Sequence, residues 1–144
     1  MLDAECQYTI PTEYADALNE RDYGDYTGKN KWDMEQLLGE EEFTKLRRGW
    51  DYPIPHGESL KMVYKRVVPF FQSQVLPKLA EGKNVLIVSH GNALRALIKY
   101  IEQIPDADME HIEMEFGSIR MYDLDPEGHK VNCEIRKIEE TVNA

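Results

Sequence analysis

The clearest periodic pattern of apolar residues lies between residues 59 and 80. Apolar side chains recur there at helical spacing, namely at Leu60, Val63, Tyr64, Val67, Val68, Phe71, Val75 and Leu79. This spacing predicts a long helix with one buried face. Ser59 precedes the pattern and suits the N-cap position, whereas Pro69 falls inside it and predicts a kink. We interpret this helix as part of the protein core.

A second pattern begins at Val85. Residues 85–88 are all apolar and mostly β-branched, which is typical of a strand buried on both faces, as in a parallel sheet. A polar turn over 89–92 follows, and helical spacing resumes over 93–101. The pattern therefore predicts that His90 lies at the carboxyl end of a buried strand, where the next helix begins.

This position gives His90 two interpretations. Ligands bind at the carboxyl edge of open α/β sheets, and the free N–H groups of a helix N-terminus attract anions. His90 would then hold a phosphate or transfer a proton beside one. Alternatively, His90 only caps a structural turn, and spacing alone leaves both interpretations open.

The rest of the chain is less regular. The stretch 18–31 is rich in charge, tyrosine and glycine and lacks a period, which is typical of a surface loop. The other predicted elements are a helical segment over 33–48 with an interruption at Gly39, a short helix from Asp106, and two strands over 118–124 and 131–138 joined by a turn.

Length and charge narrow the class of protein. The 144 residues suit one domain with a sizeable core. A net charge of −10 argues against nucleic acid or an anionic membrane as a partner, although a locally basic site can still bind a small anion. The cysteines, Cys6 and Cys133, show neither metal-ligand spacing nor a disulfide framework. Because no apolar run reaches transmembrane length and no signal peptide is visible, we expect a cytoplasmic protein.

Five segments together resemble a known family. They cover residues 18–24, 28–31, 47–51, 57–60 and 89–97. In this order they resemble the cofactor-dependent phosphoglycerate mutases, which belong to the histidine phosphatase superfamily. The resemblance runs from about Leu2 to about Leu124, and five segments in order make it highly specific.

The resemblance implies a fold and an activity. The expected fold class is α/β, a mostly parallel sheet flanked by helices. The parent activity would interconvert 3-phosphoglycerate and 2-phosphoglycerate, in glycolysis and gluconeogenesis, through a phosphohistidine enzyme. The reaction would be primed by 2,3-bisphosphoglycerate, and no metal is implied.

The resemblance also implies a role for individual residues. Glu20 would be the acid/base residue that exchanges a proton with the substrate hydroxyl. His90 would stabilise the transferring phosphoryl group, because this chemistry depends mainly on positioning and positive charge. Arginine side chains match both phosphate and carboxylate groups. The residues expected to bind the substrate are Arg21, Asp22, Tyr23, Lys31, Arg47, Arg48, Gly91 and Asn92.

One departure from the family pattern bears on activity. The family's nucleophile is a histidine in an Arg-His-Gly motif on the first strand, and this chain contains no Arg-His-Gly. The family's phosphate-binding arginine on the following helix is missing too. We therefore expect residues 1–144 to form a single, N-terminally truncated domain that lacks its first strand. Because covalent catalysis needs the nucleophile, we expect the chain alone to be inactive or nearly so.

Several explanations fit this departure. The chain could be a fragment of a longer mutase, which we rank first, or it could pair with a separate N-terminal chain. It could also be a non-catalytic remnant or scaffold that binds phosphorylated metabolites, and its open sheet edge would then promote self-association. A broad phosphomonoester phosphatase of the same superfamily is the rival enzyme. Lys31 and the pair Arg47-Arg48 favour the mutase, because they suit a second anionic group.

Overall fold

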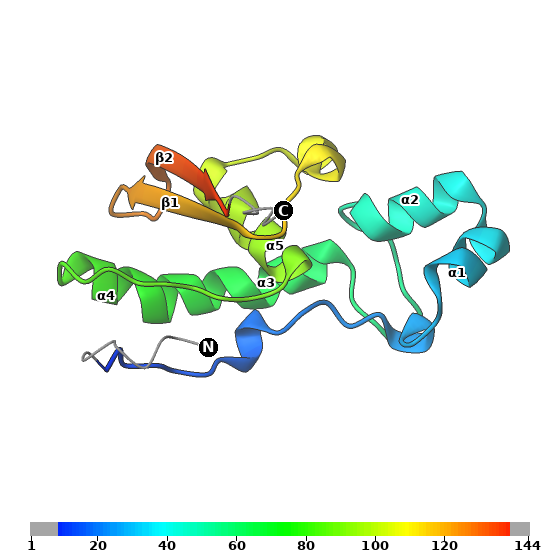
Figure 1. Ribbon diagram of the computed structural model, residues 1–144, viewed down its shortest axis with the longest axis horizontal. Coiled ribbons are helices and arrows are strands. Elements are labelled where there is room, and N and C mark those ends of the chain that lie inside the picture. Colours follow the sequence, from blue (N-terminus) through cyan, green and yellow to red (C-terminus); the bar gives the residue numbers. More distant parts are fainter. Residues whose placement is uncertain (1–8, 139–144) are drawn as a thin grey trace, which may run out of the picture.

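A computed structural model describes residues 9–138 of the chain. Residues 1–8 and 139–144, and with them Cys6, lie outside the described part. The helices are α1 (Lys31–Leu38), α2 (Glu40–Arg48), α3 (Leu60–Phe70), α4 (Leu76–Ala80) and α5 (Gly91–Glu102), and the strands are β1 (Ser118–Leu124) and β2 (Lys130–Lys137). Short 3-10 turns cover η1 (Asp16–Leu18), η2 (Gly24–Tyr26) and η4 (Asp106–His111), and a π-helical turn forms η3 (Phe71–Val75). In Figure 1 the pair α1 and α2 lies at one end of the molecule, away from α4 and the strands.

The long helix predicted from residue 59 onward is confirmed. It runs through α3, η3 and α4, and Figure 1 shows these elements following one another along the molecule. The Ser59 side chain caps α3 by accepting a hydrogen bond from the main-chain N–H of Met62. The irregularity expected near Pro69 takes the form of the π-helical turn at 71–75, a common form of helix irregularity.

The main core forms where α3 and η3 pack against α5. Its buried members are Leu60, Val63, Val67, Phe71, Val75, Ala93, Ala96, Leu97, Ile101 and Met109. A smaller core joins the α1–α2 pair to the loop before α3 through Met34, Leu46 and Ile54. The predicted break at Gly39 is confirmed, because Gly39 has a φ of 80° and ends α1 immediately before α2 begins.

The two strands predicted near the C-terminus are confirmed as an antiparallel hairpin. Ser118 of β1 pairs with Lys137 of β2, and the ladder continues to Leu124 opposite Lys130, with one register shift. In the turn, the Asp125 side chain accepts hydrogen bonds from the main-chain N–H groups of Glu127 and His129. This hairpin is the one sheet found within residues 9–138.

The prediction for residues 85–88 is wrong in one respect. The segment leads into α5 as expected, and Val85 and Ile87 pack against the main core. Leu86 and Val88, however, are 74% and 83% exposed, and the segment joins no ladder within the described residues. A short apolar run does not specify how many of its faces are covered. The described residues therefore show helices and an antiparallel hairpin rather than the mostly parallel sheet that we predicted.

Candidate active site

The Glu20 carboxylate lies at the N-terminus of α5. Glu20 is half-buried in the loop after η1, and its Oε2 is 3.4 Å from the main-chain nitrogen of Asn92. Its Oε1 accepts a hydrogen bond of 2.7 Å from the main-chain N–H of Arg21. The unpaired N–H groups and the dipole of a helix N-terminus favour negative charge at this position. In this structure the negative charge comes from the protein itself.

His90 is the N-cap residue of α5 and is exposed. Its carbonyl accepts the first helical hydrogen bond, from Leu94. Its imidazole makes no hydrogen bond to any residue between 9 and 138, so it is not engaged in capping the turn there. A Cβ added at the neighbouring Gly91 would meet no atom within 4 Å. Apart from its chain neighbours and the backbone of α5, no described residue therefore crowds Gly91 at the N-terminus of the helix.

Asn92 links the Glu20 loop to α5. Its side chain is buried, and its Nδ2 donates a hydrogen bond of 3.0 Å to the Tyr23 hydroxyl. Its Oδ1 accepts a hydrogen bond of 3.1 Å from the Arg95 guanidinium. These contacts hold the residues before and after Arg21 against the first turn of α5, so that Glu20, Tyr23, Gly91 and Asn92 form one site beside His90.

Arg21 has a different environment from the one expected of a substrate ligand. Its side chain is buried, and its three nitrogens donate hydrogen bonds to the carbonyls of Glu58, Leu46 and Tyr52. Burial lowers the pKa of the Arg21 guanidinium below its usual range. With these donors engaged by the main chain, Arg21 joins the Glu20 loop to α2 and to the segment before α3.

The Asp22 side chain is also engaged locally. It accepts a hydrogen bond of 2.8 Å from the main-chain N–H of Gly24 and so closes a turn. Asp22 itself is exposed.

The remaining predicted ligands, all cations, lie at the start of α1 and at the end of α2. Arg48, at the end of α2, is half-buried, and its guanidinium pairs with the Glu113 carboxylate at 2.9 Å. Arg47 is exposed, with its guanidinium 5.8 Å from the centre of the Phe43 ring. Lys31, the first residue of α1, is exposed. None of these three cations bonds to Glu20 or His90 in the described structure.

The sequence pattern gave no role to Arg95, which connects this site to α2. Arg95 is buried and donates hydrogen bonds to Asn92 Oδ1 and to the carbonyls of Arg48, Met109 and Ile112. It therefore fixes the end of α2, and with it Arg48, relative to the N-terminus of α5. In the sequence, the feature that could have indicated this role is a charged residue three positions after Asn92 on an otherwise apolar helix face.

Comparison with known proteins decides the family. The family model described as histidine phosphatase superfamily (branch 1) matches residues 2–134. The chain belongs to the histidine phosphatase superfamily. The family resemblance drawn from the five sequence segments is thereby confirmed at the level of the superfamily.

Relatives of this superfamily member include several proteins named 2,3-bisphosphoglycerate-dependent phosphoglycerate mutase. The protein of Parvibaculum lavamentivorans is 42% identical over 120 residues, which are 83% of this chain and 57% of that protein. That of Cytophaga hutchinsonii is 41% identical over 81% of this chain and 54% of its own length. That of Methanosarcina mazei is 45% identical over 78% and 47%, respectively. The chain thus spans about half the length of the curated relatives it matches.

Within residues 9–138, no three His, Cys, Asp or Glu side chains are grouped as a metal site requires. No helix in that range is both long enough and apolar enough to span a membrane.

Proposed function

We propose that this chain supplies the acid/base and substrate-binding part of a phosphoglycerate mutase, which interconverts 3-phosphoglycerate and 2-phosphoglycerate. The observation that carries the proposal is the position of the Glu20 carboxylate at the N-terminus of α5, where the His90 imidazole bonds to no residue between 9 and 138. The names of the relatives support the same reaction. The proposal includes the cytoplasm as the compartment in which the protein acts.

In this proposal each group has one task. Glu20 exchanges a proton with the substrate hydroxyl, because it is the carboxylate next to the place where the phosphate would bind. His90 and the N–H groups of Gly91 and Asn92 stabilise the negative charge of the phosphoryl group in transit. Arg48, turning away from Glu113, would bind the carboxylate or second anionic group of the substrate.

The same residues fit 2,3-bisphosphoglycerate as a primer. This ligand carries two phosphates and a carboxylate, and the site offers the open N-terminus of α5 together with exposed cations. Lys31 and Arg47 are exposed and without an acidic partner among the described residues, and they would hold the groups farther from His90. When bound, 2,3-bisphosphoglycerate would supply a phosphoryl group to the nucleophilic histidine of the parent mutase's Arg-His-Gly motif, which residues 1–144 do not contain.

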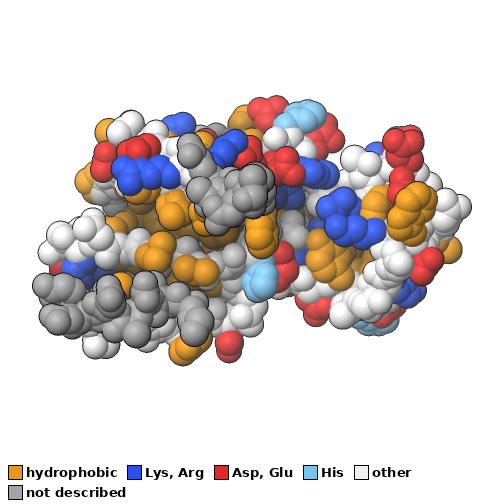
Figure 2. All heavy atoms as spheres, in the orientation of Figure 1, with side chains coloured by type: hydrophobic (Ala, Val, Ile, Leu, Met, Phe, Trp, Pro, Cys, Tyr) orange, Lys and Arg blue, Asp and Glu red, His pale blue; other side chains and the backbone are white. Residues whose placement is uncertain are grey.

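We also propose that residues 85–88 pair with a further strand, which would extend the fold toward the mostly parallel sheet that we predicted. The strand would come from the N-terminal part of a longer mutase of which this chain is a fragment, from a separate N-terminal chain, or from a second copy of this chain. The exposure of Leu86 and Val88 in an extended segment supports this. The hydrophobic side chains gathered between the hairpin and the helices in Figure 2 support it as well.

Phosphorus NMR of the purified chain with 3-phosphoglycerate and a trace of 2,3-bisphosphoglycerate tests the proposal. We expect the substrate resonances to broaden with the wild type and not with the Arg47→Ala/Arg48→Ala variant. Arg136→Ala, which removes an exposed arginine from β2, is the charge control. Formation of 2-phosphoglycerate that stops in His90→Ala would show that the chain turns over by itself. Release of inorganic phosphate alone, or no broadening with the wild type, would contradict the proposal.

A further inference from the structure

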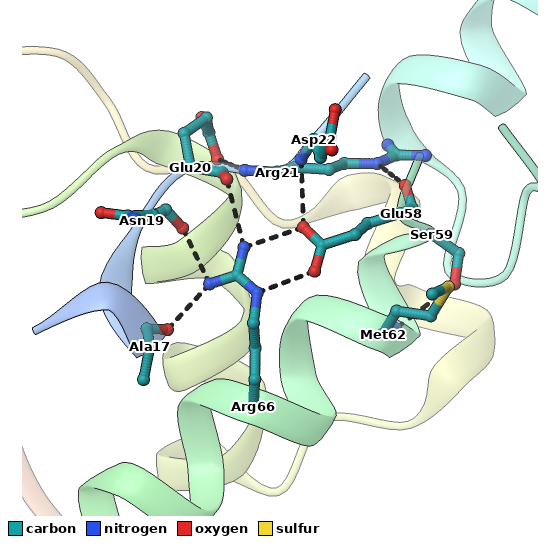
Figure 3. Close-up of polar contacts among 9 residues, drawn as sticks. All are labelled: Ala17, Asn19, Glu20, Arg21, Asp22, Glu58, Ser59, Met62 and Arg66. Atoms are coloured by element: carbon teal, nitrogen blue, oxygen red, sulfur yellow. Dashed lines mark hydrogen bonds and ion pairs between the residues drawn. The ribbon is translucent and has the colours of Figure 1, made fainter. Parts of the chain in front are cut away.

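Arg66 gathers the main chain around Glu20 without reaching the reaction site. It lies on the second turn of α3, and its Nη1 donates hydrogen bonds to the carbonyls of Ala17 and Asn19, at 2.8 and 2.9 Å. Its Nη2 donates a hydrogen bond to the carbonyl of Glu20 at 3.1 Å. Three carbonyls within four residues of chain thus converge on one guanidinium, as Figure 3 shows.

The Glu58 carboxylate holds this guanidinium in place. Glu58 lies just before the N-cap of α3 and accepts hydrogen bonds from Arg66 Nε and Nη2, at 2.8 and 2.9 Å. Such paired contacts fix the plane of an arginine side chain. Glu58 Oε2 also accepts a hydrogen bond of 3.0 Å from the main-chain N–H of Asp22. Glu58 and Arg66 therefore hold the main chain on both sides of Glu20.

The Glu20 side chain extends from this bound main chain toward α5. Arg66 binds the main-chain carbonyl of Glu20, while the Glu20 carboxylate contacts the main-chain N–H groups of Arg21 and Asn92. The reach of a glutamate side chain is short, so the position of its main chain decides whether its carboxylate meets the N-terminus of α5.

We propose that Arg66, locked by Glu58, is a positioning residue that sets the Glu20 carboxylate against the N-terminus of α5. The importance of that position for catalysis rests on the proposed function, but the positioning itself does not. Arg66 would act through the main chain of Glu20 and would touch no substrate.

A second ion pair offers a matched control. Arg120 pairs with Glu102 at 3.1 Å and also donates a hydrogen bond to the Glu113 carbonyl. The Arg66 and Glu58 side chains are 26% and 20% exposed, and those of Arg120 and Glu102 are 21% and 18% exposed. The two arginines are therefore similarly buried in a glutamate ion pair, although Arg66 makes five hydrogen bonds and Arg120 two. Of the two, only Arg66 binds the main chain around Glu20.

Amide NMR of the full chain without substrate tests the proposal. The Glu20→Gln variant first shows how the amide chemical shifts of Arg21 and Asn92 change when the Glu20 carboxylate is lost. We expect Arg66→Met to move both amide resonances toward their Glu20→Gln positions and to speed hydrogen exchange at Arg21 by about tenfold or more. Arg120→Met should leave both amides at their wild-type positions.

Arg66→Lys and Glu58→Gln keep the test informative if Arg66→Met fails to fold. Lysine cannot bind both Glu58 oxygens and three carbonyls at once, so both variants should produce the same two shifts in weaker form. The proposal is overturned if these amides keep their wild-type positions in every folded Arg66 and Glu58 variant. It is also overturned if Arg120→Met moves them equally. Because no substrate is present, failure of the mutase proposal leaves this result unaffected.

Discussion

At the scale of single residues, three arginines organise this site, of which Arg21 and Arg95 are buried and Arg66 is half-buried. Arg21, Arg66 and Arg95 direct most of their donors to main-chain carbonyls of segments far apart in the sequence. A guanidinium has five N–H donors and no acceptor, so one side chain can join several loops. No buried side-chain nitrogen or oxygen between residues 9 and 138 lacks a hydrogen-bond partner. The site is thus held together by guanidinium groups whose donors bind the protein's own main chain.

The Glu20 carboxylate occupies a place suited to an anion, which leads to a prediction about affinity. A substrate phosphate bound at the N-terminus of α5 would be repelled by this carboxylate. Replacing it with a neutral amide should therefore strengthen binding even while it abolishes proton transfer. A charge near a helix terminus contributes about 0.3–1 kcal/mol, so we expect Glu20→Gln to bind 3-phosphoglycerate about two- to fivefold more tightly.

Isothermal titration calorimetry at low salt would measure this change. Glu134→Gln, which removes an equal charge from an exposed position on β2, is the control for net charge. Weaker binding by Glu20→Gln, or equal strengthening by Glu134→Gln, would show that the Glu20 carboxylate does not compete with the substrate phosphate.

At the scale of elements, α3 connects the core to the site. Its apolar face packs against α5, while Arg66 and the adjoining Glu58 hold the loop that carries Glu20. The Arg66 guanidinium beside Glu58 holds the pKa of that carboxyl below its usual range. The stability of the contact between α3 and the loop should therefore depend on pH.

The sign of this dependence follows from the lowered pKa. A carboxyl whose pKa is lower in the folded state stabilises the fold above its unfolded pKa, about 4.3 for glutamate. That stability is lost as the pH falls through the lower, folded pKa. We expect Glu58→Gln to reduce the free energy of unfolding by about 1–2 kcal/mol at pH 7, and the difference from wild type to shrink below about pH 4. Urea unfolding from pH 3 to pH 7 measures it, and a difference that grows toward acid would contradict the argument.

The elements that sequence patterns predicted well are those with local causes. The helix from α3 to α4, the break at Gly39 and the hairpin follow from periodicity, a positive φ and turn residues close together in the chain. The exposure of Leu86 and Val88 could not be predicted from the sequence pattern, because the burial of an extended segment depends on which other elements cover it. The long-range contacts of Arg21 with Leu46 and Tyr52 were likewise beyond a local pattern.

In the candidate site, too, features with local causes were predicted, and those that depend on long-range contacts were not. The helix N-terminus at His90 was predicted from local pattern, and Glu20, Tyr23 and Asn92 entered through family resemblance. Their convergence depends on Arg66 and Arg95, to which neither pattern nor resemblance gave a role. A guanidinium that binds main-chain carbonyls leaves no mark in the sequences of the segments it binds, because every residue carries a carbonyl.

At the scale of the whole molecule, the extended segment 85–88 is an unusual surface. Val85 and Ile87 pack inward, whereas Leu86 and Val88 point away from the core and remain exposed. An extended segment with exposed apolar side chains and free main-chain groups is a template for pairing with another strand. The net charge of −10 opposes association between copies, so pairing needs an attractive surface, which this edge offers.

Substitution of this edge should therefore abolish association. We expect the wild-type chain to form dimers or larger species in native mass spectrometry, and Leu86→Lys/Val88→Lys to be monomeric. Trp32→Lys/Leu37→Lys on α1 is a matched control, because Trp32 and Leu37 are 72% and 68% exposed. Both double variants add two positive charges to the same chain.

The charge change makes the comparison decisive. Two added lysines reduce the net negative charge equally in both variants, so self-repulsion falls in each. Dissociation of the Leu86/Val88 variant alone would then have to come from the lost apolar edge rather than from electrostatics. A wild-type chain that remains monomeric would remove self-association as the role of this edge. Pairing with a strand from the N-terminal part of a longer mutase, or from a separate chain, would then be the remaining way to cover Leu86 and Val88.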